Sequence, residues 1–347
     1  MFRKKYTPHS ALYELTLRCN MSCLHCGSSA GKKRAKELTT DEWLNVSKDL
    51  AEIGCSYVTL LGGEPLLRKD WYEIAKGIRD YGLKLTIISN GLLIDEKMIS
   101  KLKDLDLYTV AISLDGATAE THDKIRQVKG SFKRCKQVLS MLKDAEINTS
   151  VITTLNKINF EELPTLRDFL IDKGVAWQLQ FAVPIGRFPR DLALSKEEFY
   201  SAAMFIETSR KKYGIKKLPV MGAHCFGYHS KYLRNVNIIP IWKGCQAGVS
   251  SLGIQSNGGV KGCLSLDDTY LEENILKTSI KEIWNSPKFA EYNRQFKKEQ
   301  LGENCMDCKY GKSCKGGCMS ASTAITGKAH NDSYCFKLIE ESPDFKI

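Results

Sequence analysis

Six short apolar segments alternate with amphipathic stretches over the first half of the chain, and this alternation most limits the possible folds. The segments are rich in Val, Ile, Leu and Thr, a composition typical of buried strands. Strands joined through helices form a parallel sheet with right-handed crossovers, so the sequence predicts an α/β fold. The expected strands cover residues 11–17, 57–62, 84–90, 108–115, 149–156 and 177–183.

Helix signals lie between these segments. Thr39 and Glu42 have the spacing of a capping box, and the helical pattern that follows them stops at Gly54. A second helical pattern covers residues 70–82, and a third begins at Ser131. A closed or partly closed barrel and an open doubly wound sheet give the same alternation, so periodicity alone does not choose between them.

The alternation breaks after the sixth strand. One helix follows, opened by a capping box at Ser195 and Glu198, and then loop-like sequence. From residue 241 onward Cys and Gly are dense and long apolar runs are missing, so bound metal would have to supply folding energy. We expect a partial, TIM-like (β/α)6 barrel, a bridging region and a small loop-rich iron–sulfur domain, over residues 1–190, 191–240 and 241–347.

Bulk composition is that of an ordinary globular chain, with 347 residues, 26% charged and 43% hydrophobic. No run of eighteen apolar residues exists, and the start MFRKKYTPHS lacks the apolar region of a signal peptide. We therefore expect a cytoplasmic protein without membrane association. The net charge of +11 counts the thiols as neutral, and the Lys and Arg residues are scattered, so nucleic-acid binding is not indicated.

The chain has thirteen cysteines, most of them clustered. Because the cytoplasm keeps thiols reduced, metal or redox cofactors are a better interpretation than disulfides. The densest group is Cys19, Cys23 and Cys26, spaced C-x3-C-x2-C after the first strand. Structural zinc takes four ligands, usually as two pairs, and no second pair lies nearby. A [4Fe–4S] cluster held by three thiolates instead keeps one iron open for an amine and a carboxylate.

Other polar motifs also follow strands directly. Function in a parallel barrel gathers in the loops after the carboxyl ends of the strands, so these motifs predict one active-site mouth. They are Gly62, Gly63 and Glu64 after the second strand, Ser89 and Asn90 after the third, and Ser113 and Asp115 after the fourth.

The stretch CNMSCLHC resembles the C-x3-C-x2-C signature of the radical S-adenosylmethionine (SAM) enzymes, with His25 where that family usually has an aromatic residue. The resemblance covers residues from about 10 to 190. It implies that Cys19, Cys23 and Cys26 hold a SAM-binding [4Fe–4S] cluster.

The same resemblance assigns SAM contacts. GGEP resembles the motif that receives the methionine amino group, with Glu64 accepting the ammonium and the glycines allowing a close approach. SLDG resembles the fourth-strand motif, which implies ribose or methionyl contacts for Ser113 and Asp115. Arg126 matches an arginine that binds the methionine carboxylate. The implied SAM-binding residues are Gly62, Gly63, Glu64, Ser89, Asn90, Ser113, Asp115 and Arg126.

The later cysteines resemble the seven-cysteine SPASM extension of radical SAM enzymes that mature peptides and proteins. The resemblance implies two auxiliary [4Fe–4S] clusters, and a zinc ribbon fits the spacing poorly. The outer cluster would be held by Cys305, Cys308, Cys314 and Cys335, and the inner one by Cys245, Cys263 and Cys318, which leaves the inner cluster one ligand short.

Cys225 lies upstream, where some relatives supply the missing thiolate. Four interpretations remain open for it: ligand of the inner cluster, bystander to an open cluster that binds substrate, hydrogen-atom donor, or buried structural cysteine. No other catalytic residue is indicated. His224 and His229 could suggest zinc, but no cysteine pair accompanies them. Cys55 and Cys135 are expected to be ordinary core cysteines.

The implied reaction is reductive cleavage of SAM, after which a 5′-deoxyadenosyl radical removes hydrogen from a substrate. An external donor of the flavodoxin or ferredoxin type would supply the electron. Relatives with this extension mostly modify ribosomally made peptides or proteins, through thioethers, carbon–carbon crosslinks, epimerisation or residue oxidation. Others act in tetrapyrrole or redox-cofactor biosynthesis. An electron-transfer protein would need clusters but would leave GGEP and SLDG without a purpose.

The barrel is expected to begin near residue 10, which leaves no room for an N-terminal peptide-recognition domain. A separate recognition protein could take that role.

Overall fold

The structure is a computed structural model and describes residues 6–237 and 242–345. Its strands are β1 (Ser10–Thr16), β2 (Tyr57–Gly62), β3 (Lys84–Ser89), β4 (Thr109–Ser113), β5 (Thr149–Leu155), β6 (Ala176–Phe181), β7 (Val220–Gly222), β8 (Ser251–Ile254), β9 (Gly259–Lys261) and β10 (Glu273–Asn274). Its helices are α1 (Thr40–Glu52), α2 (Trp71–Asp80), α3 (Glu96–Asp104), α4 (Ala119–Arg126), α5 (Ser131–Asp144), α6 (Leu163–Leu170), α7 (Lys196–Lys217), α8 (Ile280–Asn285), α9 (Glu291–Arg294), α10 (Gly311–Cys314), α11 (Met319–Thr326) and α12 (Phe336–Glu340).

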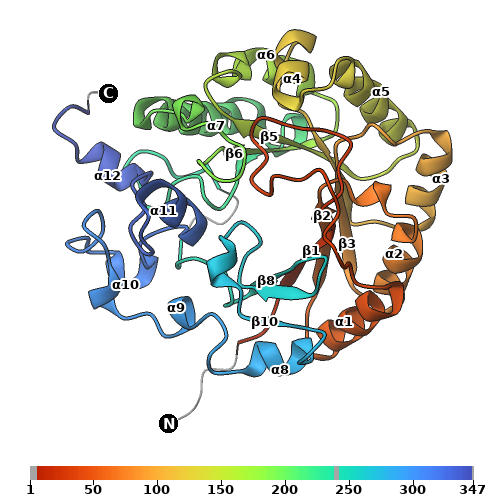
Figure 1. The fold of residues 1–347 in the computed structure, drawn as a ribbon. Coiled ribbons are helices and arrows are strands. Elements are labelled where there is room, and N and C mark those ends of the chain that lie inside the picture. The colour runs from red at the N-terminus through yellow and green to blue at the C-terminus, as the bar shows by residue number, and fades with distance from the viewer. Residues whose placement is uncertain (1–5, 238–241, 346–347) are drawn as a thin grey trace.

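These strands form one ten-stranded sheet in the order β10-β9-β8-β1-β2-β3-β4-β5-β6-β7. Strands β1 to β7 are parallel and follow the chain in order, which places their connecting helices on one face. Figure 1 shows α1 to α6 around the outside of the curved sheet. A doubly wound sheet would reverse its strand order, so the partial barrel is confirmed. Within the described residues the sheet does not close, because β7 and β10 are its two ends.

The sequence signals at the helix starts are confirmed. Thr39 accepts a hydrogen bond from the backbone N–H of Glu42, and Glu42 accepts one from the N–H of Thr39, which is the reciprocal capping box that begins α1. Ser195 and Glu198 make the same pair at the start of α7. The chain leaves α1 through Gly54, whose φ of +89° suits a glycine.

The main core lies between the outer face of the sheet and the helices. Alternate residues of each strand enter it, because side chains of a strand point to opposite faces. On β1 these are Ala11, Tyr13 and Leu15, all fully buried. Tyr13 stacks on Trp43 of α1 with ring centroids 4.5 Å apart. Burial of these large side chains fixes α1 against the sheet and so positions the strand ends at the rim.

The opposite face of the sheet is the interior of the partial barrel, and it is only half-buried. Packed layers of branched side chains fill the interior of a closed TIM barrel. Here many inward residues of β1 to β7 remain partly exposed, although Glu14, Thr16 and Ala111 are buried. The partly exposed residues include Leu12, Thr59, Leu61, Thr86, Ile88, Ser150, Ile152, Thr154, Gln178, Gln180 and Met221.

The sheet extends across the segments expected from the sequence. Strand β7, in the bridging region, pairs with β6, and β8, in the cysteine-rich segment, pairs in parallel with β1. The buried carboxylate of Glu14 accepts hydrogen bonds from the backbone and hydroxyl of Ser256 and a bidentate pair from Arg34, at 2.6 and 2.9 Å. Glu14 therefore ties β1 both to the loop that follows it and to the C-terminal segment.

Among the described helices, none has both the length and the apolar character needed to cross a bilayer.

Candidate functional site

The loop after β1 carries Cys19, Cys23 and Cys26 and is fixed by backbone contacts. Cys19 N–H donates to the carbonyl of Gly31 at 3.0 Å, which closes the loop at its base. Arg187, on the segment after β6, donates to the carbonyls of Ala30 at 2.6 Å and Cys23 at 3.3 Å. The three thiols are thus presented at the carboxyl end of the barrel, where the sequence predicts them.

The environment of Cys19 and Cys23 favours the protonated thiol in the absence of metal. Burial raises the pKa of Cys19 to about 11, and the charges of Glu64, Cys23 and Cys26 add to that effect. Burial also raises the pKa of Cys23, while the charge of Arg126 opposes the rise. Metal binding would therefore have to release protons from this loop.

In the described part of the chain, no three Cys, His, Asp or Glu side chains converge closely enough to hold one metal ion.

The two glycines of GGEP pack β2 against the start of the cysteine loop. A Cβ on Gly63 would lie 2.2 Å from the carbonyl oxygen of Arg18, and one on Gly62 would lie 2.3 Å from that of Thr16. Glycine is therefore needed here because two backbone segments touch. This packing was not foreseen from the sequence, which suggested close approach of a ligand.

Replacing Gly63 with Ala is expected to lower the free energy of unfolding by about 1–3 kcal/mol, because overpacking forces the backbone of Arg18 to move. Urea denaturation of the metal-free chain measures this loss. Gly31→Ala, in the neighbouring cysteine loop, is the matched control, because a Cβ there would meet nothing within 4 Å. Equal stabilities for the two variants would contradict the assigned packing.

Glu64 is fully buried behind this turn and connects the ends of β2 and β3. Its carboxylate accepts hydrogen bonds from the N–H of Leu66 at 3.2 Å, the hydroxyl of Ser89 at 3.0 Å and the N–H of Asn90 at 2.8 Å. Burial raises the pKa of Glu64 to about 7, although these hydrogen bonds lower it. Asn90 also donates to the side chain of Asn20 in the cysteine loop, at 2.7 Å.

Asp115 is the centre of a buried network at the end of β4. Its Oδ2 accepts from Nε2 of His25 at 2.7 Å and from Nη2 of Arg126 at 2.5 Å, and its Oδ1 accepts from the N–H of Thr154 at 2.8 Å. Although burial alone would raise it, Arg126 and His25 hold the pKa of Asp115 well below its usual range. His25 thus links the cysteine loop to the fourth strand.

Arg126, at the end of α4, contributes to the same network through its ion pair with Asp115. Its Nη1 lies 3.8 Å from Sγ of Cys23, and its Nε is buried without a partner among the described residues. Ser113 is half-buried beside it, and its hydroxyl has no hydrogen-bond partner within the described chain. All eight residues implied in SAM binding therefore gather at one rim.

Some residues of this rim were missed by sequence reasoning. The backbone N–H of Asp115 donates to Nδ1 of buried His122 at 3.1 Å, and Asn159 donates to the carbonyl of Asp115 at 2.8 Å. Burial lowers the pKa of His122 to about 4, so this imidazole stays neutral and can accept. Neither residue belongs to a recognisable motif, since only the folded chain brings them to Asp115.

The outer cysteine set lines a cavity of about 230 Å³ in the C-terminal segment. Burial raises the pKa of Cys305 to about 12 and that of Cys335 to about 11, and neighbouring thiols and Asp332 add to both shifts. The cavity also contains His229, which stacks on Tyr310 with centroids 4.0 Å apart. Its four cysteines are Cys305, Cys308, Cys314 and Cys335.

Cys225 lies near the proposed inner set of Cys245, Cys263 and Cys318. Burial raises the pKa of Cys225 to about 12, and the charges of Asp332 and Cys263 contribute. The pKa of Cys318 is raised by burial and then by the nearby thiols of Cys245 and Cys225. Cys225, Cys245, Cys263 and Cys318 are therefore electrostatic neighbours. Cys55 and Cys135 are both buried; the thiol of Cys55 contacts the carbonyl of Tyr57, and that of Cys135 lies 3.6 Å from the carbonyls of Asn90 and Ser113.

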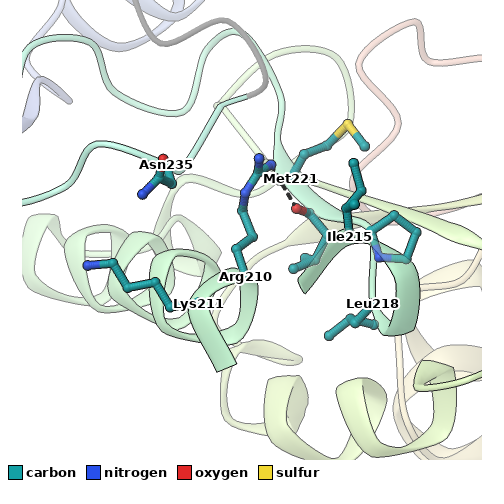
Figure 2. A pocket seen from close by; sticks show the side chains of 8 residues that line it. Arg210, Lys211, Ile215, Leu218, Met221 and Asn235 are labelled. Atoms are coloured by element: carbon teal, nitrogen blue, oxygen red, sulfur yellow. Dashed lines mark hydrogen bonds between the residues drawn. The ribbon is translucent and has the colours of Figure 1, made fainter. Parts of the chain in front are cut away.

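A different cavity, of about 340 Å³, lies beside the edge strand β7 and the end of α7 (Figure 2). Arg210 donates there to the carbonyl of Val220 at 3.1 Å. Ile215, Leu218 and Met221 give it an apolar wall. None of the cysteines or rim residues lines this cavity, so the candidate site lies elsewhere.

Comparison with known proteins agrees with this geometry. Residues 13–170 match the family model of the radical SAM superfamily, and residues 245–309 match SPASM, an iron–sulfur cluster-binding domain. AdoMet-dependent heme synthase of Methanosarcina barkeri is 31% identical, covering 94% of this chain and 96% of that protein. Mycofactocin maturase MftC of Mycolicibacterium smegmatis is 28% identical, covering 90% of this chain and 79% of that protein.

The fold is shared with SuiB of Streptococcus suis bound to S-adenosylmethionine. That structure has a TM-score of 0.78 at 17% identity and covers 95% of this chain and 77% of the SuiB chain. The matched segments coincide with the partial barrel that carries Cys19, Cys23 and Cys26 and with the beginning of the second cysteine set. The chain thus belongs to the radical SAM superfamily and carries a SPASM iron–sulfur cluster-binding domain.

Proposed function

We propose that this chain cleaves SAM reductively and removes a hydrogen atom from a residue of a peptide or protein. The observation that carries the first part is the position of the three-cysteine loop directly beside Arg126, whose buried Nε has no partner among the described residues. An unsatisfied buried donor costs stability, so such an atom fits a ligand carboxylate. When bound, SAM and its [4Fe–4S] cluster supply the 5′-deoxyadenosyl radical.

Each rim residue receives a defined task. Cys19, Cys23 and Cys26 would hold the cluster, and Arg126 would orient the methionine carboxylate. Glu64 already accepts three hydrogen bonds, and a carboxylate has about four acceptor sites, so one remains for the methionine ammonium. The hydroxyl of Ser113, which has no partner in the described part of the chain, would bind the ribose. Asp115 acts by positioning His25 and Arg126, because these and Thr154 occupy its oxygens.

The two C-terminal cysteine sets would hold auxiliary clusters. Cys305, Cys308, Cys314 and Cys335 line one cavity, as ligands of one cluster should. Cys225 completes a set of four with Cys245, Cys263 and Cys318, which favours the ligand role among its possible roles. The protein would then bind three clusters, and an external flavodoxin- or ferredoxin-type donor would provide the electron. The thirteen free thiols fit a reducing cytoplasm.

The peptide assignment rests on the barrel interior. The inward residues of β2 to β7 are hydroxyls, amides and aliphatic groups, without charge beyond Lys84 at the amino end of β3, and the inward Glu14 of β1 is neutralised by Arg34. Gln180 and Thr154 form a hydrogen-bonded pair there, at 2.9 Å. Neutral donors and acceptors of this kind match peptide amides, whereas a substrate with several carboxylates would favour Arg or Lys.

A radical step in tetrapyrrole biosynthesis is the second candidate. One observation favours it: the similarity to the M. barkeri heme synthase extends over nearly the whole of both chains. The two candidates differ in the charge that the substrate brings into the barrel, which makes them separable by experiment.

The test uses anaerobically reconstituted protein. We expect about twelve irons per chain, for three cubanes, and formation of 5′-deoxyadenosine from SAM under dithionite. One or two zincs without iron would refute the proposal. For the substrate, peptides encoded next to the gene and iron-coproporphyrin III are compared by mass spectrometry. Modification of the peptide supports the first candidate, and loss of carboxyl groups from the porphyrin supports the second.

A further inference from the structure

Buried polar atoms without a hydrogen-bond partner are rare in proteins, and each one calls for an explanation. Six side chains of the described residues have such an atom, and three of these lie next to a cysteine set. Arg126 Nε lies beside the SAM loop, and His229 Nε2 belongs to a residue that lines the outer cavity. The third is the hydroxyl of Tyr292, beside the inner set.

Tyr292 lies on the short helix α9 and packs with Cys245 and Cys263 in one small apolar cluster. Its ring makes an edge contact with Tyr270, at 5.1 Å between centroids and 82° between planes. The next residue, Asn293, donates to the carbonyls of Cys245 at 2.8 Å and Ala247 at 2.7 Å. These contacts fix α9, and Tyr292 with it, against the segment that carries Cys245.

The hydroxyl itself is directed at the backbone next to Cys263. A Cβ on Gly262 would lie only 2.3 Å from this oxygen, so a glycine at this position makes room for it. A phenol has an ordinary pKa of about 10 and keeps its proton at neutral pH. A protonated donor is therefore buried in the cluster that contains Cys245 and Cys263, without any acceptor from the described protein.

We propose that the Tyr292 hydroxyl donates a hydrogen bond to a sulfur of the inner auxiliary cluster, at or next to the thiolates of Cys245 and Cys263, and raises the reduction potential of that cluster. The inference rests on the proposed function, which places a cluster on these thiols. Hydrogen bonds to the sulfurs help to set the potential of an iron–sulfur cluster, because they stabilise the reduced, more negative state.

The experiment compares wild type, Tyr292→Phe and Tyr270→Phe, each reconstituted with iron and sulfide. Reduction is followed by electron paramagnetic resonance during a potentiometric titration. In Tyr292→Phe we expect an unchanged iron content and a more negative potential for one of the three clusters. Tyr270→Phe is the control, because it removes the hydroxyl of the neighbouring ring and should leave all three potentials unchanged.

A second readout separates hydrogen bonding from packing. In the metal-free chain the hydroxyl of Tyr292 has no partner among the residues that the structure describes, so Tyr292→Phe should unfold at the same urea concentration as wild type or a higher one. A lower midpoint would show that the hydroxyl is needed for packing and would overturn the inference.

The outcomes also distinguish the inference from the proposed function. If wild type assembles all three clusters and Tyr292→Phe leaves every potential unchanged, only the hydrogen bond is refuted. If wild type lacks the inner cluster and binds about eight irons, for two cubanes, the ligand assignment fails and the inference fails with it.

Discussion

Cys23→Ala is expected to abolish cleavage of SAM and to remove about four of about twelve irons, the content of one cubane. Cys23 is the most buried of the three loop thiols and the one nearest to Arg126, with Nη1 at 3.8 Å. Without it two thiolates would remain for a cluster that the proposal gives three, and the cysteine loop would lose its contact with the guanidinium of Arg126. The measurements are iron analysis and 5′-deoxyadenosine formed under dithionite.

Cys55→Ala is the matched control for this prediction. Cys55 is equally buried, in the main core, and its thiol donates only to backbone carbonyls, at 3.4 Å to Tyr57. Its loss should leave both iron content and SAM cleavage unchanged. Full SAM cleavage by Cys23→Ala would contradict the assignment of the loop, while equal losses in both variants would trace the effect to the fold.

Much of the fold can be predicted from local sequence patterns. The capping box of Thr39 and Glu42 begins α1 where the spacing predicts it, because the reciprocal hydrogen bonds involve only neighbours in the chain. The six strand segments also form as predicted, since β-branched and apolar runs between helices leave few alternatives. The barrel required more, namely the order of strands, which the resemblance supplied and periodicity could not.

The candidate site shows where such reasoning ends. The motifs predicted that Glu64, Asp115 and Arg126 lie at one rim. Glu64 and Asp115 follow the carboxyl ends of parallel strands, and Arg126 was assigned to the same site by the family resemblance. The motifs could not show that Asp115 accepts from both His25 and Arg126, because these residues are 90 and 11 positions away in the chain. Nor could the motifs show that position 63 must be a glycine because the backbone of Arg18 lies against it. Such contacts depend on how the strands pack.

The extension of the sheet was likewise beyond sequence reasoning. Strand β7 has only three residues and β8 four, too few for a periodic signal. Their strand character comes from pairing with β6 and β1, which are already in place. Because β8 lies next to β1, the second cysteine set begins close to the strand that carries the first, and this proximity links the two domains physically.

Asp115→Ala is expected to lower the free energy of unfolding by about 3–5 kcal/mol, the usual loss when one partner of a buried ion pair is removed. The substitution leaves the buried guanidinium of Arg126 without its counter-charge and frees His25, which holds the cysteine loop to β4. We therefore also expect a lower occupancy of the SAM cluster. Urea denaturation of the metal-free chain measures the first effect, and iron analysis measures the second.

The size of this loss depends on burial, and the chain offers a matched pair to show it. Asp106 pairs with Arg79 at 2.9 Å, but its side chain is 93% exposed, whereas that of Asp115 is fully buried. Water and salt screen an exposed pair, so Asp106→Ala should change stability little. If Asp115→Ala cost no more than Asp106→Ala, then His25 and Arg126 would not depend on Asp115, and the cysteine loop would be held mainly by Arg187 and Glu14.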